Sequence, residues 1–202
     1  MRIRTHANPL SNRKRFDKIH PKEIFKDFDN KLDLEIGFGQ SSFILQYAQD
    51  NLDRSIVGIE VRKKAVEIMQ KKVDVQKLEN IFLVHGNGMV CLQDMFGDHS
   101  IDKIFIFHPD PWIKSRHHKR RLINFEFLQI LQGKLKNGAN VYVSTDVDFL
   151  WEDICKNFEA SNSFIKVKDD DFWQNYYSGR WDEIVKAKNR QTFFATFCLN
   201  KY

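Results

Sequence analysis

The sequence predicts an α/β fold in which a mostly parallel sheet is covered by helices on both faces. Short apolar, β-branched runs alternate with helical stretches between residues 32 and 158, and each run ends in a glycine or a polar residue. Parallel strands need crossover helices and are buried on both sides, so they read as continuous apolar runs. A chain of 202 residues, 42% of them hydrophobic, is long enough for one such domain with a sizeable core.

The first unit begins with "LDLEIGFG" at residues 32–39, which we expect to form a buried strand and a turn. A helical stretch follows at residues 41–51, where Ser41 or Ser42 can cap the helix. Its apolar residues share one helix face: Phe43, Ile44, Tyr47 and Ala48.

Four further strands are expected at residues 55–61, 81–86, 101–108 and 140–145. A helical stretch with one apolar stripe follows each strand, through residues 65–73, 89–96, 122–135 and 149–158. After residue 163 the alternation stops. "FIKV" at 164–167 and "TFFATFCL" at 192–199 read as a C-terminal antiparallel hairpin that brings the sheet to seven strands. We therefore expect a single domain at residues 31–202, preceded by a basic N-terminal arm at residues 1–30.

The net charge of +5 is distributed unevenly along the chain. Residues 1–22 hold seven Lys and Arg against one acid, and residues 114–121 hold five Lys and Arg and no acid. The remaining residues therefore sum to +5 − 6 − 5 = −6. Two basic patches on an acidic body indicate a polyanionic partner such as nucleic acid.

Other features exclude several classes of protein. No segment approaches the roughly 18 to 20 unbroken apolar residues of a membrane span, and the N-terminus lacks the apolar core of a secretory signal. The sequence thus predicts a cytoplasmic protein. The cysteines, Cys91, Cys155 and Cys198, are odd in number and far apart, so we expect reduced core thiols and neither disulfides nor a zinc site.

The carboxyl ends of the first two strands carry acids where a cofactor would bind. Ligands of open α/β sheets lie beyond these strand ends. Glu35 precedes the turn glycines Gly37 and Gly39, and Glu60 ends the second strand, where a carboxylate can accept both hydroxyls of a ribose. A dinucleotide fingerprint would need glycine at Ser42. Two acids therefore favour a cofactor with a ribose and positive charge, such as S-adenosylmethionine.

The later strand ends add three more candidates. Asn87 follows the third strand and suits an adenine edge, Asp110 follows the fourth, and Asp146 follows the fifth. Asp110 lies between two prolines, which leave its backbone little freedom. For Asp146 two interpretations remain open, a substrate acceptor that can also orient Lys114, or a helix N-cap.

The segment "HPDPWIKSRHHKRR" at residues 108–121 joins Asp110 to a run of cations. Trp112 either stacks on a displaced base or packs beneath the loop. The neighbouring histidines make poor geometry for one metal ion, so we expect no metal site. We expect five side chains to hold RNA phosphates: Lys114, Arg116, Lys119, Arg120 and Arg121.

Five motifs occur in the order and at about the spacing of one known family: "LEIGFGQ", "VGIEV", "HGNG", "HPDPWIKSRHHKRR" and "VSTD". Over residues 32–150 the chain resembles the tRNA (guanine-N7)-methyltransferases, and "RTHANPL" near the start is similar to the arm of some members. The resemblance implies a Rossmann-like class I methyltransferase that transfers a methyl group from S-adenosylmethionine to a guanine in the tRNA variable loop, usually at tRNA position 46.

The resemblance also implies roles for single residues. Asp110 falls on the catalytic position and, with others, on cofactor-binding positions: Glu35, Gly37, Gly39, Glu60, Asn87 and Asp110. Lys114 and Asp146 fall on substrate positions. The RNA-contacting run comprises Arg116, His117, His118, Lys119, Arg120 and Arg121. Many bacterial members have a Thr-x-Phe-Glu substrate loop near the C-terminus, and "GRWD", ending at Asp182, is its nearest equivalent here.

Guanine N7 already carries an in-plane lone pair, so methyl transfer to it depends mainly on positioning. We expect Asp110 to accept hydrogen bonds from the guanine Watson-Crick edge or from the ammonium of the cofactor, and to stabilise growing positive charge. An amino-group methyltransferase of the N6-adenine type is a weaker alternative, because its motif runs Asp/Asn-Pro-Pro-aromatic rather than Pro-Asp-Pro-Trp. An inactive RNA-binding protein is the other alternative. The sequence leaves open a monomer, a homodimer or a partner subunit.

Overall fold

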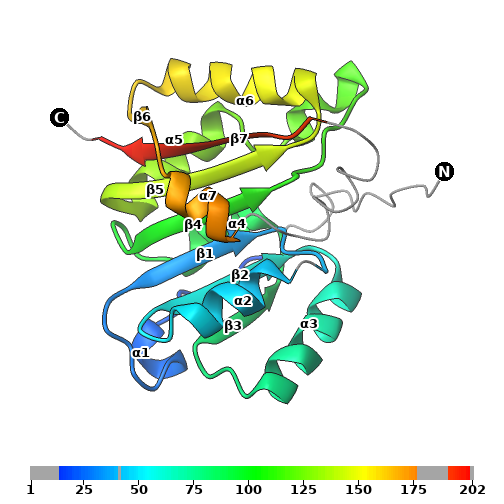
Figure 1. Cartoon of the computed structure of the whole chain (residues 1–202). Helices are drawn as coiled ribbons and strands as arrows, with labels where there is room; N and C mark the ends of the chain where they lie inside the picture. The colour runs from blue at the N-terminus through cyan, green and yellow to red at the C-terminus, as the bar shows by residue number, and fades with distance from the viewer. Residues whose placement is uncertain (1–13, 41, 177–190, 201–202) are drawn as a thin grey trace.

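The computed structural model of the chain describes residues 14–40, 42–176 and 191–200, and its centre is one seven-stranded sheet (Figure 1). The strands lie in the order β3-β2-β1-β4-β5-β7-β6. Their bounds are Leu32–Ile36 (β1), Ser55–Glu60 (β2), Ile81–His85 (β3), Ile101–Phe107 (β4), Leu135–Thr145 (β5), Phe164–Val167 (β6) and Phe193–Leu199 (β7). Strands β1 to β5 pair in parallel, whereas β7 pairs antiparallel with β5 and β6. The predicted parallel sheet with an antiparallel C-terminal pair is confirmed.

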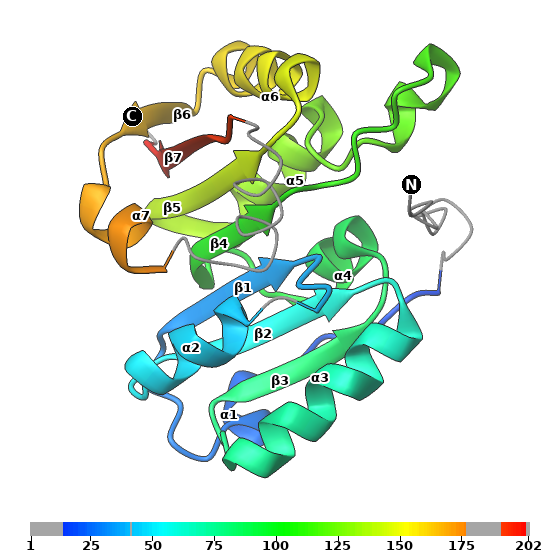
Figure 2. The same cartoon turned by 45° about the vertical axis from the view of Figure 1, so that its right-hand side comes forward.

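The helices cover both faces of the sheet (Figure 2). Their bounds are Pro21–Ile24 (α1), Phe43–Asp50 (α2), Lys63–Gln76 (α3), Gly88–Met95 (α4), Phe125–Lys134 (α5), Asp148–Ser161 (α6) and Asp170–Tyr176 (α7), with a 3-10 helix η2 at Ser115–Arg120. One core cluster joins the sheet to α4, α5 and α6, and a second joins it to α2, α3 and α7.

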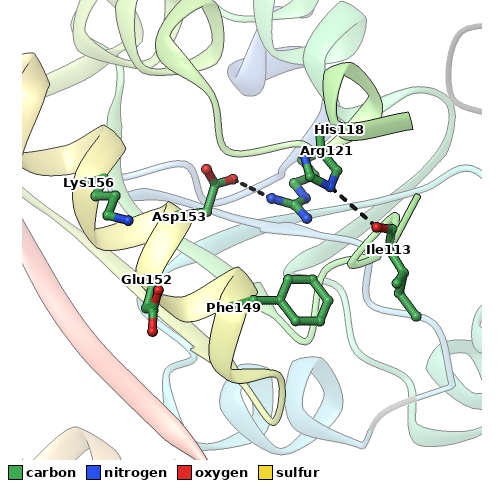
Figure 3. A pocket seen from close by; sticks show the side chains of 7 residues that line it. All are labelled: Ile113, His118, Arg121, Phe149, Glu152, Asp153 and Lys156. Carbon is green, nitrogen blue, oxygen red and sulfur yellow. Dashed lines mark hydrogen bonds and ion pairs between the residues drawn. The ribbon is translucent and has the colours of Figure 1, made fainter. Parts of the chain in front are cut away.

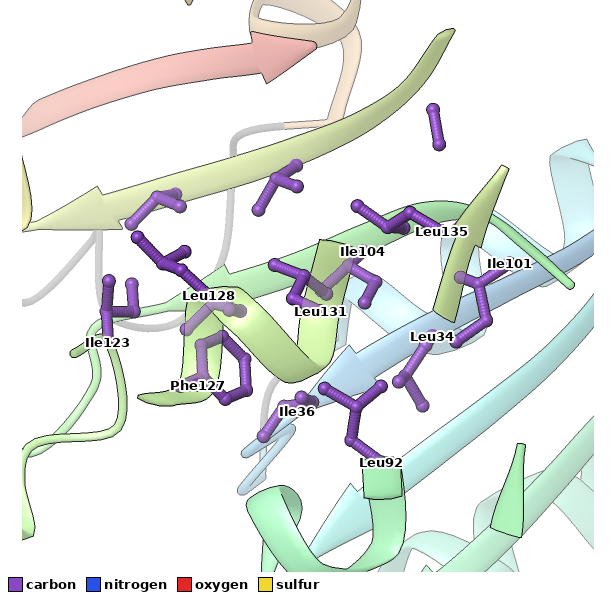
Figure 4. Close-up of a cluster of buried hydrophobic side chains, with 14 of the residues drawn as sticks. Leu34, Ile36, Leu92, Ile101, Ile104, Ile123, Phe127, Leu128, Leu131 and Leu135 are labelled. Carbon is purple, nitrogen blue, oxygen red and sulfur yellow. The ribbon is translucent and has the colours of Figure 1, made fainter. Parts of the chain in front are cut away.

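The apolar side chains of β1 belong to a cluster of buried hydrophobic residues (Figure 4). Leu34 and Ile36 point towards α5, where they belong to the same cluster as Phe127, Leu128 and Leu131. Because successive side chains of a strand point to opposite faces, the acids that alternate with these residues, Asp33 and Glu35, lie on the other face. The cluster against α5 fixes β1 beside β4, and with it the strand ends that carry the candidate site.

The boundary between α5 and β5 differs from the prediction. Leu135 was expected on the apolar stripe of the helix, but α5 ends at Lys134 and Leu135 begins β5, opposite Ile101. A fully buried leucine satisfies either pattern, so periodicity cannot choose between them. The ladder to β4 decides, and it shifts register between Ile101 and Lys103.

The described part of the expected arm, residues 14–30, lies against the domain. Phe25 is only 3% exposed and belongs to the core cluster under α4 and α5. The Ile19 N–H donates to the Met95 carbonyl at 2.8 Å. A Cβ placed at Gly86 would lie 2.7 Å from the ring of Phe16, so this glycine admits the ring. Apolar residues among the cations therefore attach the described part of this segment to the body of the domain.

Smaller expectations also meet the structure here. Ser42 is the N-cap of α2 but makes no side-chain capping hydrogen bond, and Ser41 lies outside the described residues. Cys91 is buried and the other two cysteines are partly buried, all as free thiols. Within the described ranges, no helix has the length and apolar character needed to cross a membrane.

Candidate functional site

The predicted polar residues meet at one edge of the sheet. Glu35 lies in β1, Glu60 ends β2, and Asn87 follows β3, while Asp110 and Asp146 follow β4 and β5. These five strands are parallel neighbours, so their carboxyl ends share an edge. The chain runs from β1 out to β3 and then returns to β4 on the other side of β1. Such a reversal of strand order is where open α/β sheets bind ligands.

The turn after β1 requires both of its glycines. Gly37 and Gly39 have φ angles of +83° and +57°, in the left-handed region that favours glycine. The Gly39 N–H donates to Glu60 Oε2 at 2.9 Å, and a Cβ at Gly39 would lie 3.1 Å from the Arg62 guanidinium. The turn therefore packs its backbone directly onto the acid of the next strand.

Arg62 is a site residue that the sequence analysis missed. Its side chain donates to both oxygens of Glu60, each at 3.1 Å, and its backbone N–H donates to Oε1 at 2.9 Å. The hydrogen bond to Glu60 raises the pKa of Arg62, and the nearby charge of Asp110 raises it further. Glu60 thus holds four donors, and ribose hydroxyls have to share it with the Arg62 guanidinium. The only sequence signal for Arg62 is its position two residues after Glu60, the acid that ends β2.

Glu35 is the buried acid of the site without a complete set of partners. It is 2% exposed, and its Oε2 has no hydrogen-bond partner among the residues that the structure describes. Burial, and secondarily the charge of Glu60, raise the pKa of Glu35 to about 8. Buried polar atoms in folded proteins are almost always paired, so an orphaned carboxylate oxygen calls for an explanation. A positively charged ligand at this edge supplies one, and it fits the predicted cofactor.

Asn87 has a structural role in addition to its predicted one. It is the N-cap of α4, and its Oδ1 accepts from the N–H groups of Met89 and Val90 at 2.9 and 3.2 Å. These two hydrogen bonds fix the side-chain amide of Asn87, a residue that is 8% exposed at the carboxyl end of β3.

Asp110 lies in a backbone segment held by two unusual conformations. His108 and Trp112, which flank the Pro-Asp-Pro sequence, have φ angles of +47° and +42°. Left-handed conformations of residues other than glycine cost about 1–3 kcal/mol and cluster at functional sites. Trp112 packs under the Arg120 guanidinium, 5.1 Å from its ring centre, and near the His117 ring. These contacts match the packed interpretation of Trp112 and fix one end of the segment.

Asp146 does not cap α6, since Val147 holds the N-cap position and makes no side-chain cap. Instead, Asp146 Oδ1 lies 3.3 Å from Nδ1 of His108, and both side chains are almost fully buried. Of the two interpretations left open for Asp146, the helix N-cap is not found, and the side chain makes a contact between two strand ends instead. Lys114, expected beside Asp146, is exposed in the loop that follows Asp110.

The basic run divides into an exposed group and a buried residue. Residues 115–120 form the 3-10 helix η2, whose Arg116, His118 and Lys119 are exposed. His117 is half-buried and its pKa is lowered, first by desolvation and then by the neighbouring cations.

Arg121 departs from its expected contact with RNA. It is 6% exposed, its Nε donates to the Pro111 carbonyl at 2.9 Å, and its Nη1 donates to Asp153 at 3.0 Å. A guanidinium is retained below the surface only where its donors find acceptors. Arg121 thus joins the Asp110 segment to α6. Lys114, Arg116 and Lys119 are the cations of this run that are exposed to solvent.

A surface hollow of about 340 Å³ lies between this loop and α6 (Figure 3). Figure 3 shows the Arg121–Asp153 pair across it and the His118 side chain directed to the carbonyl of Ile113. Its lining contains both cations and acids, so their charges balance. The lining residues are Ile113, His118, Arg121, Phe149, Glu152, Asp153 and Lys156. Over the described ranges, no three His, Cys, Asp or Glu side chains gather in a way that could hold a metal ion. Asp182 and the rest of "GRWD" lie outside the described residues.

Solved structures of other proteins have a similar fold. The chain is similar to the 16S rRNA methyltransferase KamB (11% identity, TM-score 0.66, 93% of this chain and 96% of that chain) and to a SAM-dependent methyltransferase from Aquifex aeolicus (16% identity, TM-score 0.57, 89% of each chain). These likenesses concern the fold alone.

Sequence relatives are more specific. A family of putative methyltransferases matches residues 29–193. A tRNA (guanine-N(7)-)-methyltransferase of Prochlorococcus marinus (strain MIT 9215) is 33% identical over 98% of this chain and 96% of that protein. One of Marinobacter nauticus is 34% identical over 85% of this chain and 71% of that protein. The chain therefore belongs to the tRNA (guanine-N(7)-)-methyltransferase family.

Proposed function

We propose that the protein transfers the methyl group of S-adenosylmethionine to N7 of a guanine in the variable loop of tRNA, at tRNA position 46, in the cytoplasm. The observation that carries this proposal is the edge of the sheet where Glu35, Glu60 and Asp110 converge beside an exposed basic loop. Membership in the family supports the reaction and the substrate.

The residues at this edge suit S-adenosylmethionine, which supplies an electrophilic methyl group on a positively charged sulfur. Glu35 provides a buried acceptor for positive charge, and Glu60 provides one for the ribose hydroxyls. Gly37 and Gly39 let the backbone approach the ligand, and Asn87 stands at the adenine end.

Asp110 is assigned the catalytic position. Guanine N7 needs no deprotonation before it attacks a methyl group, so rate comes from alignment and from stabilising the charge that grows on the purine. An ionised carboxylate accepts hydrogen bonds only, and the guanine Watson-Crick edge offers N1–H and an amino group. The constrained segment from His108 to Trp112 holds the Asp110 backbone in place for this contact.

The exposed cations are assigned to the RNA backbone. Lys114, Arg116 and Lys119 are exposed on the loop and η2, where they can reach phosphates. Arg120 and Arg121 instead hold Trp112 and the Pro111 carbonyl, so they support the loop from within. Asp146, Lys114 and Asp182 complete the proposed guanine contacts.

The direct test incubates the purified protein with labelled S-adenosylmethionine and unmodified tRNA and maps the label by nucleoside digestion. We expect label only in N7-methylguanosine, and none in a tRNA whose position 46 carries adenine. Label on N6 of adenine would establish the amino-group methyltransferase instead. Tight tRNA binding without transfer would establish an RNA-binding protein.

Two sets of variants separate chemistry from binding. Asp110→Asn should lower the transfer rate by about 100-fold or more while tRNA affinity persists. Arg116→Ala with Lys119→Ala should weaken tRNA binding and reduce its salt slope by about 1 for each phosphate that is no longer neutralised. Lys71→Ala with Lys72→Ala on α3 removes the same charge elsewhere and is the matched control. Equal losses in all three would contradict this division of roles.

A further inference from the structure

The contact between His108 and Asp146 joins the ends of two neighbouring strands. His108 follows β4 and Asp146 follows β5, which pair in parallel up to Phe107 and Ser144. Nδ1 of the imidazole lies 3.3 Å from Oδ1 of the carboxylate, and the two side chains are 3% and 7% exposed. For this contact to be a hydrogen bond, Nδ1 carries the proton and donates it. A contact shielded from water in this way restricts the plane of the carboxylate.

The backbone of His108 is strained in this position. Its φ of +47° lies in the left-handed region, and it precedes Pro109, which favours extended conformations for the preceding residue. Conformations of this kind persist only where the surrounding structure fixes them. The His108 N–H donates to the Ser144 carbonyl at 2.8 Å, so the residue is held through its backbone as well as its ring.

The pair lies at the strand edge that carries the proposed cofactor and catalytic acids. Asp110 is two residues beyond His108, and β4 is the direct neighbour of β1, which carries Glu35. Asp146 therefore stands at the same strand edge as the proposed cofactor acids. Lys114, which the sequence suggested as the partner of Asp146, is exposed in the basic loop, whereas His108 contacts this acid directly.

We propose that His108 is a positioning residue for methyl transfer, which holds the Asp146 carboxylate in the orientation that accepts hydrogen bonds from the target guanine. This inference rests on the proposed function. His108 touches neither the methyl group nor N7; it acts through Asp146. Removing its donor therefore affects turnover and leaves cofactor binding intact.

Two substitutions separate the donor from the strain. His108→Asn places an amide donor near the position of Nδ1, and asparagine tolerates left-handed backbone. His108→Gly removes the donor and relieves the strain. We expect the Asn variant to keep kcat within about 3-fold of wild type, and the Gly variant to lose at least about 10-fold in kcat. Both should bind S-adenosylhomocysteine, measured by calorimetry, with the wild-type Kd.

A double-mutant cycle with Asp146→Asn tests whether the two residues act as a unit. If they do, His108→Gly added to Asp146→Asn lowers kcat no further, because the acid that His108 orients is already gone. Independent, multiplying losses overturn the inference, as does a Gly variant with wild-type kcat or an Asn variant as slow as the Gly variant. Weakened cofactor binding in the Gly variant also overturns it. A wild-type protein that methylates no guanine N7 refutes the proposed function itself.

Discussion

Asp33 and Glu35 are two buried acids on the same face of the same strand, and the structure treats them in opposite ways. Asp33 is fully buried, and its two oxygens receive the Arg54 guanidinium and the Tyr47 hydroxyl. Glu35, two residues nearer the carboxyl end of β1, has an oxygen without a hydrogen-bond partner in the described part of the chain. The first acid is satisfied by the fold alone.

The difference shows which buried charge maintains the domain and which is kept for a ligand. Arg54 and Tyr47 oppose the rise that burial causes in the pKa of Asp33, whereas the charge of Glu60 adds to the rise that burial causes in the pKa of Glu35. A fold that tolerates an unsatisfied acid loses stability at that point. We interpret this loss as the consequence of keeping a binding site, and four measurements test the interpretation.

The largest effect is expected from Asp33→Ala. It leaves the Arg54 guanidinium, 14% exposed, without its bidentate partner, and breaking a buried pair costs about 3–5 kcal/mol. Urea unfolding should show this loss, while the folded fraction keeps its affinity for S-adenosylhomocysteine. Asp53→Ala removes an acid from an exposed pair with Lys31 and should change stability little. An equally stable Asp33→Ala protein would contradict the structural role.

Glu35→Gln should act on the ligand and spare the fold. The glutamine keeps the shape of the side chain but loses its charge, so binding of S-adenosylmethionine should weaken about 10- to 100-fold, or ~1.4–2.8 kcal/mol. Calorimetry measures the affinity, and unfolding in the absence of cofactor should show no loss of stability at pH 8. A variant destabilised as strongly as Asp33→Ala would remove the distinction between the two acids.

The stability of the cofactor-free protein should depend on pH through Glu35. Burial raises its pKa from 4.5 to about 8, so the folded state holds the proton more tightly than the unfolded state. The contribution of this group to stability is therefore fully present below pH 4.5 and lost as the pH rises through 8. Relative to Glu35→Gln, wild type should lose on the order of 2 kcal/mol between pH 6 and pH 8. A constant difference in unfolding free energy across this range would show that Glu35 does not titrate there.

The smallest effect is expected from Tyr47→Phe. The Tyr47 hydroxyl donates to Asp33 at 2.9 Å, and its loss leaves the guanidinium contacts of Asp33 in place. Such a neutral donor to a buried acid is worth about 1–2 kcal/mol. Thermal unfolding at pH 7 measures it. The ring contacts of Tyr47 with Phe43 and Phe105 remain, so a loss as large as that of Asp33→Ala would assign the stability to the tyrosine instead.

Local patterns were enough to predict most of the fold. Continuous apolar runs, each followed by a helix with one apolar face, predicted the five parallel strands, and the change of pattern after residue 163 predicted the antiparallel pair. The strand-end positions of Glu60, Asn87, Asp110 and Asp146 follow from the same alternation, because parallel strands end at one edge.

Side-chain partners could not be predicted in this way. Arg120 and Arg121 are read from the sequence as members of a basic run, yet one stacks on Trp112 and the other is buried against Asp153, 32 residues away in the chain. Arg62 lies outside every quoted motif, and His108 begins "HPDPWIKSRHHKRR" without a role that the motif predicts. A run of charged residues in a sequence predicts the sign of the surface charge. It does not predict which of those residues face solvent.

By itself, then, the sequence determined the layered α/β architecture, the edge at which the acids gather and the family, because these depend on periodicity and on short motifs. Tertiary structure alone decided that Leu135 begins a strand, that residues 16–25 attach to the core and that His108 meets Asp146. It also decided that both oxygens of Asp33 are paired, whereas one oxygen of Glu35 has no hydrogen-bond partner among the described residues. Each of these outcomes depends on contacts between segments distant in the chain, where packing and hydrogen bonding choose among conformations that are locally equivalent.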